Sequence, residues 1–120
     1  MYKQTVEAFI AVSNAPMIAG QILARVGQFC QSAVLTETES RLEFGEAQAI
    51  IKPVAEGLLF WVAASDELIS NAIQALLQGS VFLIAPTSDT GAIQWYASNG
   101  KPFETIRSQL VGKRIKAGRA

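Results

Sequence analysis

The stretch from Leu58 to Ala64 is apolar at every position, and it limits the folds open to this chain. A strand with one face in water alternates apolar and polar residues, whereas this one carries apolar side chains on both faces. We therefore expect it at the centre of a sheet. Because side chains alternate along a strand, three of them share one face: Leu59, Trp61 and Ala63. Both faces of such a sheet must be covered, and this requirement shapes the interpretation below.

The other strands that the sequence predicts are short and follow one another closely. Thr5–Val12 alternates in part, with Thr5 and Glu7 on its polar side. Further strands are predicted at Ala33–Thr38, Arg41–Phe44, Ala47–Val54, Val81–Ala85 and Ala92–Ala97. Pro53 confines its strand to an edge or an end. Because no helical crossover separates the middle strands, we expect hairpins and a mainly antiparallel sheet of about five strands.

Two segments have apolar residues at helical spacing, Pro16–Cys30 and Asp66–Gln78. The first contains Gly20 and Gly27, each of which costs about 1 kcal/mol relative to alanine in a helix, and we interpret them as marks of close packing against the sheet. Gly79 is expected to end the second helix.

A third, shorter helix is predicted from Pro102, with Phe103 and Ile106 on one face. The resulting fold class is α+β: two layers, a mainly antiparallel sheet, two main helices on one face and a short C-terminal helix. We expect residues 1–112 to form a single domain and residues 113–120 a flexible basic tail.

Composition narrows the functional classes. The chain has 120 residues, half of them apolar, with a formal net charge of zero and no histidine. A neutral chain has no global field to attract nucleic acid or a membrane, so we expect neither as a partner. Without histidine the commonest general base and metal ligand is missing, and we expect no catalytic residue, no metal and no cofactor. Cys30 is the single cysteine, which fits the cytoplasm, and we expect it to be a buried, inert thiol.

Three groups of side chains have a functional interpretation beside a structural one. The aromatic and apolar group is expected to form core, with a pocket or an oligomer interface as the alternative: Leu59, Trp61, Ala63, Trp95, Tyr96 and Phe103. A carboxylate group is expected to be a solvated strand face, with metal ligands or an acid–base pair as the alternative: Glu37, Glu39, Glu43 and Glu46. A basic group could contact phosphates but is expected to be a solvated tail: Lys113, Arg114, Lys116 and Arg119.

Residues from Ala11 to about Ala97 resemble a small family of uncharacterised bacterial domains, some of them joined to siderophore-interacting ferric reductase proteins. The matching places are Ala11-Val12-Ser13, Leu23 with Phe29-Cys30, Arg41-Leu42-Glu43-Phe44-Gly45, Gly57-Leu58-Leu59 and Ala64-Ser65-Asp66-Glu67. The family carries histidines after the helix cysteine, where this chain has Gln31 and Ser32. The resemblance implies a fold, a bacterial cytoplasmic setting and a loose link to iron metabolism, but no reaction.

The sequence therefore favours a non-enzymatic accessory or binding domain that acts as a homodimer. The helices can cover only one face of the central strand, and the other must be buried by a second copy, by the third helix or by a ligand. The alternatives are a secretion-type chaperone that holds a partner peptide along a sheet edge or groove, a small-molecule binder or carboxylate-dependent enzyme with an apolar pocket, and an RNA-binding module that uses the basic tail.

Overall fold

The computed structural model describes residues 4–84 and 93–106, and it contains one six-stranded sheet in the order β2-β3-β4-β5-β1-β6. All neighbouring strands are antiparallel. The strands are β1 (Gln4–Ala11), β2 (Ser32–Leu35), β3 (Ser40–Glu43), β4 (Ala47–Val54), β5 (Gly57–Ala64) and β6 (Trp95–Ala97). Two main helices, α1 (Ala15–Val26) and α2 (Glu67–Ile84), and a short 3-10 turn, η1 (Gly27–Phe29), complete the elements.

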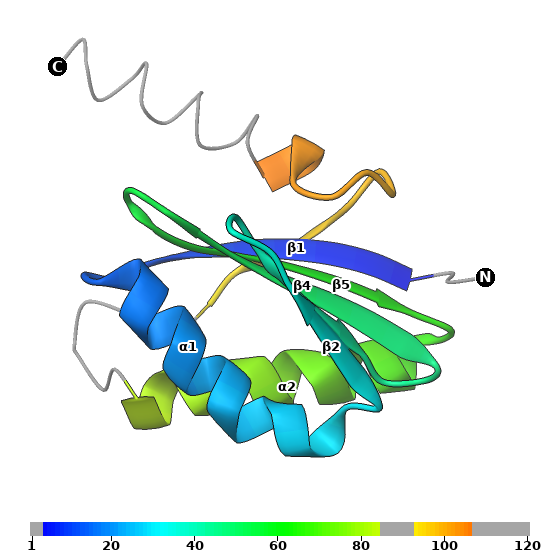
Figure 1. The fold of residues 1–120 in the computed structure, drawn as a ribbon. Coiled ribbons are helices and arrows are strands. Elements are labelled where there is room, and N and C mark those ends of the chain that lie inside the picture. Colours follow the sequence, from blue (N-terminus) through cyan, green and yellow to red (C-terminus); the bar gives the residue numbers. More distant parts are fainter. Residues whose placement is uncertain (1–3, 85–92, 107–120) are drawn as a thin grey trace, which may run out of the picture.

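Both main helices lie on one side of the sheet, and the segment around residues 98–106 crosses the other side (Figure 1). Residues 104–106 are helical, where the sequence predicts the third helix. The predicted fold class is confirmed: α+β in two layers, with a short C-terminal helix. The predicted tail at 113–120 lies outside the described residues.

β5 has the central place that its composition predicts, with β4 on one side and β1 on the other. All eight of its residues are buried. Leu58, Phe60 and Val62 belong to the core beneath α1 and α2. Leu59, Trp61 and Ala63 belong to a separate core on the opposite face. β4 is an interior strand too, and Pro53 is accommodated near its end, beyond the last residue paired with β3.

The second helix is longer than predicted, and two expectations about it are wrong. Gly79 does not end it, and residues 81–84 continue α2 instead of forming a strand. Ile73, Leu77 and Val81 form a buried stripe at a spacing of four residues, and this stripe continues beyond Gly79 in the chain. Val81, which follows Gly79 in the chain, is buried, and the free energy gained by its burial outweighs the helix-propensity penalty of about 1 kcal/mol for glycine.

The interpretation of the glycines in the first helix is wrong as well. A Cβ added at Gly20 or at Gly27 would meet nothing within 4 Å, so neither residue marks close packing against the sheet. α1 ends at Val26, η1 continues as a 3-10 turn over Gly27–Phe29, and the backbone becomes extended at Cys30. Cys30, which follows η1, is partly buried against the core, and its Sγ donates to the carbonyl of Gly27 at 3.1 Å.

Candidate functional site

The face of the sheet opposite the main helices is closed by the segment that follows β6. Phe103 and Ile106 are buried there against Leu59, Trp61 and Ala63, with Ile50 of β4 beside them. We call these six residues the second core. Phe103 has a φ of 67°, a left-handed conformation that is unusual for a bulky residue and that its burial must stabilise. The sequence leaves three possible covers for this face: a second copy, the third helix or a ligand. In the structure, the segment that contains the third helix covers it.

Glu7 anchors that segment from beneath. The sequence places its side chain on a polar strand face, but in the structure it is fully buried. Its Oε1 accepts the backbone N–H of Ile106 at 2.9 Å, and its Oε2 accepts the hydroxyl of Ser98. The Ser98 Oγ accepts in turn from the indole N–H of Trp61 at 3.3 Å. A buried carboxylate thus satisfies polar groups at both ends of the crossing segment.

The aromatic group that the sequence singles out is divided between the two faces of the sheet. Trp95 lies on the helix side, where its ring stacks on Phe60 with centroids 6.1 Å apart and its Nε1 donates to Gln78. Tyr96 lies on the opposite face, partly buried against the second core. These side chains pack against one another in two hydrophobic cores, which is the structural interpretation given to them above.

The carboxylate group does not converge. Glu39 pairs with Arg41, its Oε2 lying 2.8 Å from the guanidinium Nε, while Glu37 and Glu46 are exposed. Across residues 4–84 and 93–106, no three acidic or cysteine side chains are placed to hold a metal ion. The four basic residues from Lys113 to Arg119 lie outside the described part of the chain.

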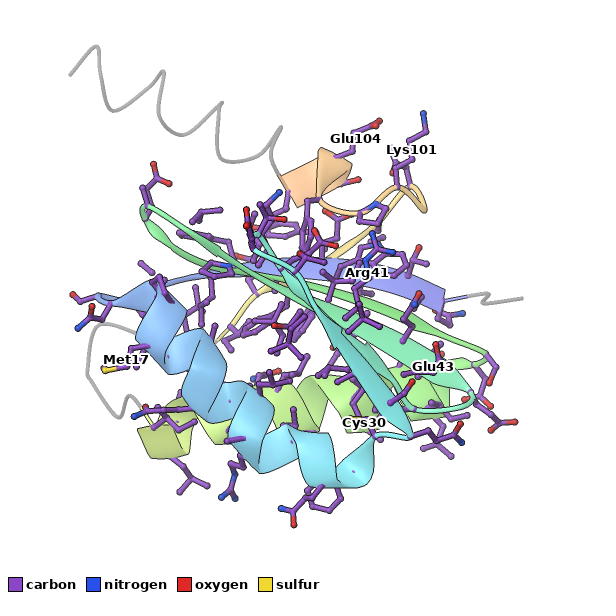
Figure 2. All side chains as sticks on the ribbon, viewed as in Figure 1. Met17, Cys30, Arg41, Glu43, Lys101 and Glu104 are labelled. Carbon is purple, nitrogen blue, oxygen red and sulfur yellow. The ribbon has the colours of Figure 1, made fainter. Side chains whose placement is uncertain are left out.

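The least expected surface is the side of the helical layer that faces away from the sheet. We call it the outer helical face, and its exposed residues are Pro16, Met17, Gly20, Gln21, Ala24 and Arg25 of α1 and Glu67, Leu68, Asn71, Ala72, Ala75, Gly79, Phe82 and Leu83 of α2. Four of them are large and apolar: Met17, Leu68, Phe82 and Leu83. In Figure 2 Met17 projects from the start of α1, at the same end of the layer as the end of α2.

α2 contributes most of this surface and is unusually apolar for a helix in contact with water. Only five of its 18 residues are buried. Leu68 is 79% exposed and Leu83 63% exposed. By length and composition alone, α2 is apolar enough to cross a membrane, although here its buried stripe packs on the sheet. A helix on a protein surface normally turns charged residues outward, and α2 has none after Glu67.

Exposed apolar side chains also occur on and near the edge strand β2. All four residues of this strand are exposed, among them Val34 and Leu35, and Phe29 of η1 is exposed nearby in the chain. Thr36 donates its backbone N–H to the carbonyl of Glu39 at 2.9 Å. Bonded residues alternate along an antiparallel ladder, so Ala33 and Leu35 turn their backbone N–H and C=O groups to the open edge.

No family model matches this chain, and no curated protein matches it. Among solved structures, the NMR structure of PA4090 from Pseudomonas aeruginosa is similar, with a TM-score of 0.66 at 14% sequence identity. The alignment covers 78% of this chain and 96% of that chain. The likeness is one of fold. It supports the α+β architecture and carries no information on activity.

The outer helical face was not among the predicted site residues, although the sequence holds a signal for it. No charged residue lies between Glu67 and Asp89. A helix of this length that packs on a sheet with one side needs apolar residues on that side only. The missing charges therefore predict that the second side of the helix is apolar as well, as the structure shows.

Proposed function

We propose that this protein is a non-enzymatic accessory domain of the bacterial cytoplasm that works as a homodimer and binds a partner protein. The observation that carries the proposal is the outer helical face, where large apolar side chains are exposed on two adjacent helices. Several large apolar side chains on one exposed face are characteristic of protein–protein contact. The family resemblance adds a setting in iron and siderophore metabolism to the same proposal.

Sedimentation velocity of the full chain tests the homodimer. At micromolar concentration we expect a species of twice the 12.9 kDa chain mass. Replacing Leu68 by Glu adds a charge at a position already 79% exposed, so it should leave the fold intact and weaken association. A wild-type chain that stays monomeric over the whole accessible concentration range would refute the homodimer.

A peptide-holding chaperone is a second candidate, and the open edge of β2 favours it. An extended segment of another protein could add a strand to this edge, with backbone hydrogen bonds to Ala33 and Leu35 and apolar contact with Val34. From a display library of unstructured peptides, we expect binders whose addition slows amide exchange at Ala33 and Leu35. Those binders should be lost from the Val34→Lys variant. Binding that survives this substitution, or leaves both amides unprotected, would contradict the β2 site.

A further inference from the structure

The arrangement of large and small residues along α2 specifies how two copies would meet. Ala72, Ala75 and Gly79 lie in the middle of its exposed side, and a Cβ added at Gly79 would meet nothing within 4 Å. Leu68 lies two helical turns before Ala75, and Phe82 lies two turns after it. The pattern is therefore large, small, large, and the two large residues Leu68 and Phe82 are equidistant from Ala75.

We propose that two copies of this chain pack α2 against α2, antiparallel, across a two-fold axis at Ala75. In that arrangement Leu68 of one copy lies beside Phe82 of the other, and small residues meet where the helices cross. Packed helices cross at an angle and diverge from the crossing point. They can approach closely only where side chains are small, and they need large side chains to fill the widening gap on either side. The sequence of α2 supplies both.

The footprint fits a stable dimer. A helix of 18 residues is about 27 Å long, and the two neighbouring helices together are about 20 Å wide. The accessible area of a surface with this outline exceeds its flat area because side chains project from it. It therefore approaches the ~800 Å² per partner of an ordinary specific interface. The two charged residues of this face, Arg25 and Glu67, stand at the ends of their helices, where they would form a polar rim.

Other occupants fit less well. A helix that lies on an anionic membrane surface carries lysine and arginine along its polar side. The exposed side of α2 has neither, and Arg25 is the one basic residue of α1. An unrelated partner helix would not require symmetry about Ala75, whereas a second copy of the same helix does. The inference rests on the proposed homodimer and adds its geometry.

A cysteine at the proposed axis tests that geometry. In a Cys30→Ser background, Ala75→Cys should form a disulfide-linked dimer on mild oxidation. Helix axes about 8–10 Å apart, less the two Cα radii of about 2.3 Å, leave the paired Cα atoms about 3.4–5.4 Å apart, and axes separated by about 9 Å or more bring them into the disulfide range of roughly 4.4–6.8 Å. Ala72→Cys is the matched control. Residue 72 lies three positions from the two-fold axis on each helix, so its two copies are separated by about 9 Å along the helices. It should cross-link little.

Charge repulsion gives an independent readout. Ala75→Glu places two carboxylates together at the axis and should raise the dimer dissociation constant roughly 100-fold or more. Ala55→Glu makes the same change in the exposed β4–β5 turn and should leave the dimer dissociation constant unchanged. If the Ala75→Glu variant dimerises normally, or if Val34→Cys cross-links and Ala75→Cys does not, the α2 packing is overturned while the homodimer stands. A wild-type monomer would refute both.

Discussion

Replacing Glu7 by alanine is expected to lower the free energy of unfolding by about 3 kcal/mol, because a buried hydrogen-bonding group and its volume are lost together. Glu7 is fully buried and lies at the middle of β1, between Trp61 of β5 and Tyr96 of β6. Without its carboxylate, the N–H of Ile106 loses its acceptor in a site that water does not reach. The hydroxyl of Ser98 loses its acceptor too.

Urea unfolding followed by tryptophan fluorescence measures this effect, since the indole of Trp61 is bonded to Ser98 and reports on the crossing segment. Glu7→Gln keeps one oxygen for Ile106 but presents an NH₂ group to Ser98, whose oxygen already accepts from Trp61 and from Gly100. The Glu7→Gln variant should therefore lose less of the free energy of unfolding, about 1–2 kcal/mol. Glu46→Ala, at an exposed position, should change stability by less than about 0.5 kcal/mol. A Glu7→Ala loss no larger than that of Glu46→Ala would contradict the anchoring role.

The burial of Glu7 is a feature that the local sequence pattern does not predict. A carboxylate that alternates with Val6, Ala8 and Ile10 is read as the solvent side of a strand. The residues that bury it, Ser98 and Ile106, lie more than 90 positions away in the chain. Alternation reports which side chains share a face, but it does not report what later covers that face. The burial of Glu7 therefore depends on tertiary contacts that local pattern does not encode.

The parts of the fold that were predicted correctly rest on strong local patterns. The apolar residues on both faces of β5 predict its central place, and the buried stripes of the two helices, together with the hairpins between the middle strands, predict both helices on one face. The end of α2 was mispredicted because glycine was read as a stop signal, while the stripe through Leu77 and Val81 continues past it. A stripe of buried residues outweighs one unfavourable propensity.

The grouping of the aromatic and apolar residues was predicted in part for the same reason. Alternation along β5 predicts that Leu59, Trp61 and Ala63 share a face, and Phe103 of the segment that contains the third helix, one of three covers that the sequence left open, packs against them. Trp95 and Tyr96 are adjacent in one strand, and adjacent residues of a strand point to opposite faces. A single pocket lined by both was therefore inconsistent with the strand that contains them, and the structure separates them.

Gly57→Ala is expected to cost about 3 kcal/mol, because a methyl group there overpacks two backbones that are already in contact. Gly57 is the first residue of β5 and pairs with Ala11 at the end of β1. A Cβ on Gly57 would lie 2.1 Å from the carbonyl oxygen of Ile10 and 2.9 Å from the Cα of Ala11. Both atoms belong to the backbone, so relief requires β1 to move away from β5 rather than a side chain to rotate.

Gly20→Ala is the control, because it is the same substitution with the opposite expected sign. No atom lies within 4 Å of a Cβ built at Gly20, and the residue is exposed in the middle of α1. Alanine there should stabilise the protein by up to about 1 kcal/mol through helix propensity. Thermal and urea unfolding of the two variants should therefore shift in opposite directions. If Gly57→Ala is tolerated with a loss below about 1 kcal/mol, β1 and β5 must be able to separate at this end at little cost, and the close approach would not be what requires glycine at this position.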